Sequence, residues 1–216
     1  MLAGAASGTA TEGDWLVADR QTTGRGRQGR EWVSPAGNLY ASGLVVLRPG
    51  DPPAPTLALV AGIALHDALA LPSAMLKWPN DMLVGTAKLA GILLERAGDA
   101  VVIGVGVNVA SRPDLPDRAA TSLAALGDPR RAGDLAAPLA HAVACWVEAW
   151  RRNGLMCICR AWLARAHRPG TPLAARLPDG IVVEGTFDGL SGDCALMLRL
   201  ADGTARVIHA GDVFLI

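Results

Sequence analysis

The sequence has no surplus of charge of either sign. Its 20 Lys and Arg side chains balance 20 Asp and Glu side chains, so the formal net charge of the 216 residues is zero. A protein that coats nucleic acid carries a basic surplus. We therefore exclude general nucleic-acid binding, and any cluster of basic residues has to be explained by local chemistry.

Long hydrophobic runs are also missing, although 51% of the residues are hydrophobic and a sizeable core is expected. Polar residues interrupt every apolar stretch before it reaches the roughly 18 residues of a transmembrane helix. The N-terminal segment 1–15 lacks the basic region and apolar core of a signal peptide. We expect no membrane span and no export signal, and hence a cytoplasmic protein.

The four cysteines lack the paired C-x-x-C spacing of a zinc or redox site. One residue separates Cys157 from Cys159, and Cys145 and Cys194 stand apart from them. We predict that the protein supplies no metal site of its own. We also predict that these cysteines are reduced thiols buried in the core.

Strand and helix signals alternate over the first three quarters of the chain. Short apolar runs bounded by turn residues predict strands, and apolar residues at helical spacing predict helices. Helices are expected over 56–71, over 133–154 with Asp134 as N-cap and Gly154 at the end, and over 158–166. Strands are expected over 14–19 (buried), 39–47, 75–78 and 101–109, with a hairpin over 82–95 that turns at Gly85-Thr86.

The character of the sequence changes after Arg168-Pro169-Gly170. Four short apolar segments follow, over 171–177, 181–190, 194–200 and 205–216, and PDG, SGD and ADG turns separate them. We therefore predict two domains. The first, residues 1–168, is an α+β domain, and the second, residues 169–216, is a small β-barrel.

The segment TGRGRQGREW, residues 23–32, matches the pattern G-x-G-x-x-G. A dinucleotide-binding fingerprint needs the glycines to open a helix. Here they lead into REWVSPAGN, whose proline and Gly-Asn pair are incompatible with a helix at that place. An RNA-binding Arg-Gly tail is disordered and repeated, whereas this segment occurs once between two strands. Two alternatives stay open: a glycine-hinged loop that brings Arg25, Arg27 and Arg30 onto a phosphate, or a solvated surface loop.

Two other segments place unusual residues on expected strands. Lys77 ends an apolar strand at KWPND, and a buried lysine needs an anion. The alternative is an edge-strand lysine that reaches water. Gly104 and Gly106 lie inside a core strand, where glycine indicates close approach of a ligand or of another chain. Asn108 either faces such a ligand or caps its own backbone.

Taken together, these segments resemble those of the biotin protein ligases (biotin–[acetyl-CoA-carboxylase] ligases). The resemblance extends through the C-terminal segment. It implies a mixed central sheet covered by helices, like that of class II synthetases, followed by an SH3-like barrel. The matching segments, in the family's order and spacing, are DRQTTGRGRQGREWVSPAGNLY, KWPNDMLVGTAKLAGILLE and VVIGVGVNV.

The resemblance also implies a reaction. An ATP-dependent ligase activates biotin as biotinyl-5′-AMP, with Mg²⁺ bound to the substrate ATP. It then transfers biotin to a lysine of the biotin carboxyl carrier domain of acetyl-CoA carboxylase or a related carboxylase. The expected protein is a monomer or weak homodimer. A lipoyl or octanoyl transferase, and a non-catalytic or degenerate biotin-binding protein, stay as alternatives.

Carried over residue by residue, the resemblance assigns a site. Lys77 bridges the biotin carboxylate and the α-phosphate, and it forms the catalytic set with Arg25 and Arg27 of the loop that orders over the adenylate. Asp81 either orients the attacking amine of the carrier or is an Asx-turn residue. The biotin-binding set is Gln21, Gly24, Arg25, Gly26, Arg27, Lys77 and Gly91, and the ATP-binding set is Arg30, Trp32, Lys88 and Asn108, with Trp32 on the nucleotide side and Asn108 at adenine.

The sequence departs from the family pattern in two ways near its N-terminus. Family members have a Ser-Thr-Asn segment about twenty residues before the position of Asp14 that contributes to the biotin pocket, and this sequence starts too late to contain it. Repressor members carry an N-terminal helix-turn-helix domain, which these residues also lack. The expectation is a monofunctional ligase with one pocket wall missing or lying upstream.

Overall fold

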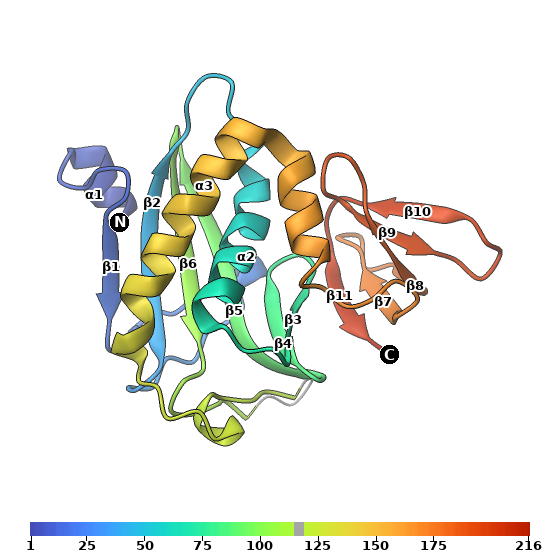
Figure 1. Ribbon diagram of the computed structural model, residues 1–216, viewed down its shortest axis with the longest axis horizontal. Helices are drawn as coiled ribbons and strands as arrows, with labels where there is room; N and C mark the ends of the chain where they lie inside the picture. Colours follow the sequence, from blue (N-terminus) through green and yellow to red (C-terminus); the bar gives the residue numbers. More distant parts are fainter. Residues whose placement is uncertain (115–118) are drawn as a thin grey trace.

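Two sheets organise the chain, and each is built from a different part of the sequence (Figure 1). The computed structural model describes residues 1–114 and 119–216. The first sheet has the strand order β1-β2-β6-β5-β4-β3. Its strands are β1 (Trp15–Ala18), β2 (Leu39–Val46), β3 (Ala74–Lys77), β4 (Asp81–Val84), β5 (Ala87–Ala97) and β6 (Ala100–Val107).

Neighbouring strands of the first sheet pair antiparallel. Parallel bridges at Leu76–Ala166 and Lys88–Ala120 add the mixed character. The β4–β5 hairpin turns at Gly85, whose φ of +58° suits glycine, as the sequence predicts. The predicted α+β class with a helix-covered mixed sheet is confirmed.

Helices cover one face of this sheet (Figure 1). The short α1 (Leu2–Ser7) precedes β1. The apolar α2 (Leu57–Leu69) packs on β5 and β6 and is covered in turn by α3 (Ala132–Leu163).

Gly154 interrupts α3 with a φ of +68°, at the predicted helix end. Arg131, not Asp134, is the N-cap: Asp134 lies one turn in and its carboxylate accepts the N–H of Arg131 at 2.7 Å. Short 3₁₀ turns lie at Arg27–Gly29, Ala54–Thr56 and Ala124–Leu126.

The strand predicted to be buried over 14–19 is an exposed edge strand instead. The side chains of Leu16 and Val17 are 54% and 48% exposed. An apolar run indicates a strand but does not show which strands have neighbours on both sides. In this sheet β1 has only β2 beside it among the described residues.

The second sheet contains β7 (Pro172–Arg176), β8 (Val182–Leu190), β9 (Leu196–Arg199), β10 (Ala205–Ile208) and β11 (Asp212–Leu215), in the order β10-β9-β8-β7-β11. The predicted final strand over 205–216 is therefore two strands at opposite edges. The predicted barrel corresponds to this antiparallel sheet, and its closure and the domain boundary at residue 168 stay predictions.

A disulfide joins Cys159 of α3 to Cys194, which precedes β9. These two cysteines are buried as predicted, but the prediction that they are reduced is wrong. Cys145 is exposed and Cys157 is only partly buried, so the prediction of burial is wrong for Cys145. Spacing could not reveal the pairing because the fold brings together two residues 35 positions apart, with 6.0 Å between their Cα atoms.

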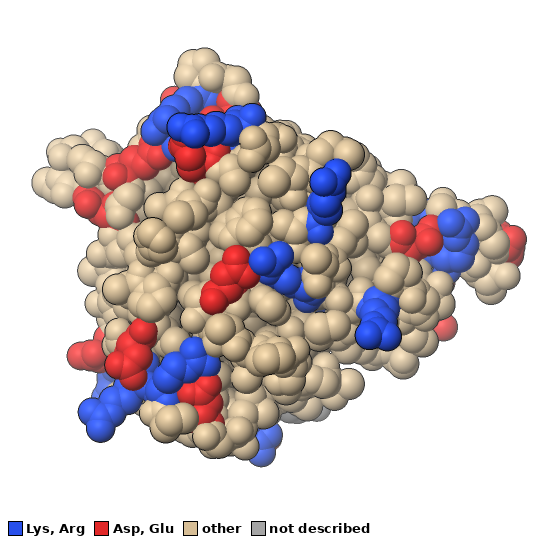
Figure 2. Space-filling model, viewed as in Figure 1, with Lys and Arg blue, Asp and Glu red and all other residues tan. Residues whose placement is uncertain are grey.

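Charged side chains on the face shown in Figure 2 form small groups of mixed sign rather than one basic field, in keeping with the zero net charge. No helix in the described part of the chain is both long enough and apolar enough to cross a membrane.

Candidate active site

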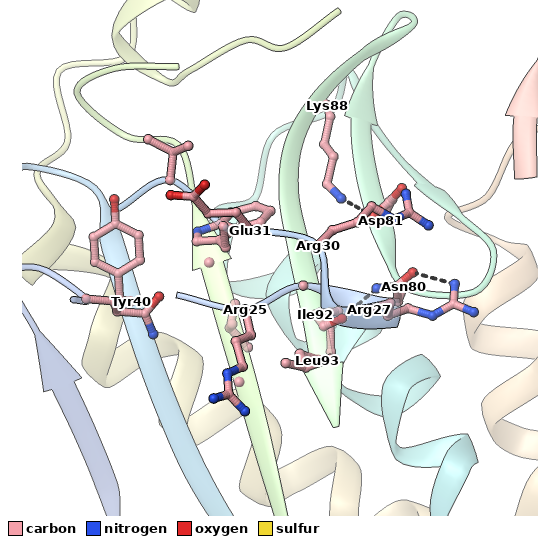
Figure 3. A pocket seen from close by; sticks show the side chains of 18 of the residues that line it. Arg25, Arg27, Arg30, Glu31, Tyr40, Asn80, Asp81, Lys88, Ile92 and Leu93 are labelled. Carbon is pink, nitrogen blue, oxygen red and sulfur yellow. Dashed lines mark hydrogen bonds and ion pairs between the residues drawn. The ribbon is translucent and has the colours of Figure 1, made fainter. Parts of the chain in front are cut away.

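A cavity of about 630 Å³ lies between the arginine-rich segment, strands β2, β5 and β6, and the start of β11. Figure 3 shows how the side chains around it are arranged. Two predicted site residues, Gly24 and Asn108, are not in its lining. The predicted residues that it brings together are Gln21, Arg25, Gly26, Arg27, Arg30, Trp32, Lys77, Lys88 and Gly91.

The arginine-rich segment 24–32 is a folded loop. The N–H of Gly26 donates to the carbonyl of Arg30 at 2.7 Å, and the N–H of Trp32 donates to the carbonyl of Gly24 at 3.0 Å. A Cβ at position 24 would overlap the Trp32 carbonyl and lie 2.7 Å from Ser34 Oγ, so glycine is required there. Gly24 therefore shapes the loop from beneath rather than lining the cavity.

Arg27 and Arg30 converge on one carboxylate, that of Asp212 at the start of β11. Arg30 forms an ion pair with it, and Nη1 of Arg27 lies 3.6 Å from Oδ1. Arg27 also donates to Asn80 Oδ1 at 3.3 Å and to the Gly211 carbonyl at 3.1 Å. Arg25 extends away from this pair over the sheet (Figure 3). The cations of the loop are thus split between two parts of the cavity.

The two lysines of the cavity share Asp81. Lys77 Nζ lies 2.9 Å from Oδ2 of Asp81, and Lys88 Nζ lies 2.5 Å from Oδ1. Burial raises the pKa of the Asp81 carboxyl, but the charges and hydrogen bonds of Lys88 and Lys77 outweigh burial and lower that pKa to about 2. Asp81 is therefore an ionised, buried anchor for both ammonium groups.

Strand register explains this cluster. Lys77 and Asp81 are paired across the β3–β4 hairpin, and Asp81 is paired with Gly91 across β4 and β5. Lys88 lies earlier on β5, from which its side chain reaches the same carboxylate. Lys77 also donates to the Val213 carbonyl at 2.6 Å. The predicted buried lysine with an anion is the arrangement found, and its side chain is largely buried.

Trp32 lies on two glycines that face each other in the sheet. Gly91 on β5 is paired with Gly106 on β6. A Cβ at Gly106 would lie 2.6 Å from the Trp32 ring, and one at Gly91 would lie 3.1 Å from it. Lys88 Nζ is 5.3 Å from the ring centroid, within cation–π range. The close approach predicted at Gly106 is therefore made by the chain's own indole, whereas at Gly104 the nearest atom, the Leu93 carbonyl oxygen, would be 3.4 Å away.

Asn108 is buried beneath the cavity wall. Its Nδ2 donates to the carbonyl of Thr121 at 3.0 Å and to that of Lys88 at 3.3 Å. This arrangement matches the backbone-capping alternative. The assignment of Asn108 to adenine stays a prediction.

Sequence reasoning missed Asn80 and Asp212. Asn80 bridges the loop to the sheet, since it accepts from Arg27 and donates to the Ile92 carbonyl at 2.6 Å. Its place within KWPND was a usable signal. No sequence signal marked Asp212, because only the folded chain brings it to a loop more than 180 positions earlier in the sequence. Within the described residues no group of three or more His, Cys, Asp or Glu side chains could hold a metal ion.

Comparison with known proteins identifies this arrangement. The Biotin/lipoate A/B protein ligase family matches residues 5–108, and the Biotin protein ligase C terminal domain matches residues 170–216. A biotin–[acetyl-CoA-carboxylase] ligase of Paracoccus denitrificans is 43% identical over 93% of this chain and 89% of its own length. Its counterpart in Mycobacterium tuberculosis is 38% identical over 99% and 83%.

Solved structures that resemble this chain are also biotin protein ligases. The biotin protein ligase from Aquifex aeolicus in complex with biotin and ATP has a TM-score of 0.84 and 26% identity, covering 96% of this chain and 91% of that one. A Leishmania major biotin protein ligase in complex with biotinyl-5-AMP has a TM-score of 0.59 and 29% identity, covering 91% and 88%. On the strength of its relatives and its fold, the chain belongs to the biotin protein ligase family.

Proposed function

We propose that this chain activates biotin with ATP, forming biotinyl-5′-AMP and releasing pyrophosphate, and then transfers biotin to a lysine of a carboxylase carrier domain. The observation that carries the proposal is the group of four cations on one side of the cavity: Arg27, Arg30, Lys77 and Lys88. They stand beside an apolar stretch of sheet that suits a ring and an aliphatic chain.

The chemistry needs such a cluster. The biotin carboxylate attacks the α-phosphorus of ATP, and pyrophosphate leaves as the phosphorus–oxygen bond to it breaks. Negative charge repels that approach, so fixed cations lower the barrier by stabilising charge. Lys77 is held by Asp81 and the Val213 carbonyl, so its position needs no reorganisation. Mg²⁺ enters as part of the substrate, bound to the phosphates of ATP.

The second step breaks the mixed anhydride. A neutral lysine amine of the carrier attacks the acyl carbon, an amide forms, and AMP leaves. Water would destroy the anhydride first if it had access, which is the reason for a loop that covers it. The loop at 24–32 forms one rim of the cavity and suits that role. Asp81 already contacts both lysines, so an incoming amine would share its carboxylate with them.

Finer expectations belong to the same proposal. The carrier is the biotin carboxyl carrier domain of acetyl-CoA carboxylase or of a related carboxylase, and the names of the two relatives above mention acetyl-CoA carboxylase for those proteins. The site residues keep the roles given above, the domains meet at residue 168, and the protein acts in the cytoplasm as a monomer or weak homodimer.

A two-step assay tests the proposal. Purified protein is mixed with MgATP and biotin, and pyrophosphate release and biotinyl-5′-AMP are measured. A carrier domain is then added, alongside a carrier whose target lysine is replaced by Arg. We expect biotin-dependent adenylate and labelling of the first carrier only. Adenylate formed from lipoate or octanoate but not from biotin would favour the related transferases instead, and no adenylate from any acid would favour a non-catalytic binding protein.

A further inference from the structure

The start of β11 contacts three of the cavity's cations with three consecutive residues. The carbonyl of Gly211 accepts from Arg27, the carboxylate of Asp212 pairs with Arg27 and Arg30, and the carbonyl of Val213 accepts from Lys77 at 2.6 Å. These groups come from the second sheet, whereas the cations come from the first sheet and its loop. The C-terminal sheet thus supplies part of the cavity wall.

Asp212 is held by its own sheet rather than by the loop. It is paired with Arg176 of β7, and a Cβ on the preceding Gly211 would lie 2.7 Å from the Arg176 carbonyl oxygen, so the backbone of position 211 lies close against β7. The Asp212 side chain is only 15% exposed. The loop, by contrast, contains no buried residue and has positive φ values at Gln28 and Gly29. The carboxylate thus belongs to a paired strand, whereas the loop lies outside both sheets.

Charge explains why the loop needs such a partner. Two guanidinium groups brought together repel each other unless an anion lies between them. A bound phosphate supplies that anion. For the phosphate to bind rapidly and tightly, however, the loop has to be in place before the phosphate arrives. Asp212 provides the negative charge in the protein itself.

We propose that Asp212 is a positioning residue that holds Arg27 and Arg30 over the cavity from the C-terminal sheet. It keeps the loop at 24–32 closed and holds the two guanidinium groups at the part of the cavity where a phosphate would bind. That the anion is the phosphate of an acyl adenylate rests on the proposed function. The positioning itself is a property of the protein without ligand, so it can be tested separately.

The test measures amide hydrogen exchange in the protein without ligand. The N–H groups of Gly26 and Trp32 close the loop, and they report on its opening. In Asp212→Asn, which keeps shape but loses charge, both should exchange about five- to tenfold faster, as expected for loss of a partly buried ion-pair network. The matched control is Asp188→Asn, which breaks the Asp188–Arg199 pair within the second sheet and should leave both amides unchanged.

A double-variant cycle separates positioning from a general loosening. If Asp212 acts through the arginines, Asp212→Asn should add nothing to the exchange of Trp32 once Arg27 and Arg30 are both alanine. Unchanged protection of the Ile103 amide in β6 from hydrogen exchange shows that the fold is intact. Wild-type protection in Asp212→Asn, or an effect that persists without the arginines, overturns the proposal.

Kinetics give the second readout. Asp212→Asn should raise the KM for ATP about five- to tenfold and speed adenylate release, while kcat changes less, because cations are misplaced before binding rather than removed. Asp212→Glu keeps the charge and should recover most of the loss. If the wild type makes no adenylate, the proposed function fails while the exchange result stands. An unchanged KM in an active Asp212→Asn enzyme overturns the positioning role.

Discussion

The ammonium nitrogen of Lys77 lies 2.9 Å from the carboxylate of Asp81, directly across the β3–β4 hairpin. A second lysine, Lys88, holds the other oxygen of the same carboxylate. The sequence contains no lysines besides these two. Every lysine of the chain therefore stands in the cavity and pairs with the same buried acid, which ties both ammonium groups to the sheet rather than to solvent.

Lys77→Ala should abolish adenylate formation and leave the fold intact. Asp81 keeps Lys88 as a partner, so no unpaired buried charge results. The lost charge should cost about a hundredfold or more in rate, since one electrostatic contact to the transition state is removed. Biotin-dependent pyrophosphate release measures the effect, and the thermal unfolding curve controls for folding. Release near the wild-type rate would show that Lys77 is structural.

Asp81→Asn should destabilise the protein in a pH-dependent way. The pKa of Asp81 is about 2 in the folded protein, against about 3.9 in an unfolded chain. A depressed pKa stabilises the fold above the unfolded value, and this contribution, about 2 to 3 kcal/mol, disappears as the pH falls through the folded value. Urea midpoints of both proteins should differ most above about pH 5 and converge toward pH 2. A constant difference across that range would contradict the assignment.

The sequence predicts the parts of this site that are set by local chemistry. Gly85 marks the hairpin turn and Gly154 marks the break in α3. Lys77 stands out because it is a charged residue at the end of an apolar strand. Each depends on backbone or burial properties of a few adjacent residues.

The remaining parts depend on the assembled fold. The partners of Arg27 and Arg30 come from β11, and the neighbour of Gly106 is Trp32. The pairing of Cys159 with Cys194 needs α3 to lie against the second sheet. A pattern shows that a glycine or a cation needs a neighbour, but not which distant residue supplies it.

Gly106→Ala should displace Trp32 and weaken ATP use. The added methyl group would lie 2.6 Å from the ring, so the indole has to move, and the cation–π contact with Lys88 goes with it. We expect the KM for ATP to rise about tenfold, equivalent to roughly 1.4 kcal/mol. The same substitution in a Trp32→Ala background should have little further effect, because the clash no longer exists. Equal losses in both backgrounds would mean that Gly106 acts through something other than Trp32.

Arg27→Gly should release the adenylate without preventing its formation. The Arg27 side chain links the loop to Asn80, to the Gly211 carbonyl and to Asp212, while Lys77 and Lys88 do not depend on it. A loop without these links opens more often, so the intermediate escapes and acylates any neutral amine it meets. Adenylate binding should correspondingly slow amide exchange at Gly26 in the wild type and much less in the variant.

The lysine content makes this outcome easy to read. An unrelated protein rich in surface lysines is incubated with the variant, biotin and MgATP, and biotinylated sites are mapped by mass spectrometry. Escaped adenylate should label that protein at many positions, whereas this chain offers only Lys77, Lys88 and its N-terminal amine. Labelling should fall when a small nucleophile such as hydroxylamine is added, because it intercepts the free intermediate. Adenylate retained as tightly as in the wild type, with no bystander labelling, would mean that the loop does not guard the intermediate.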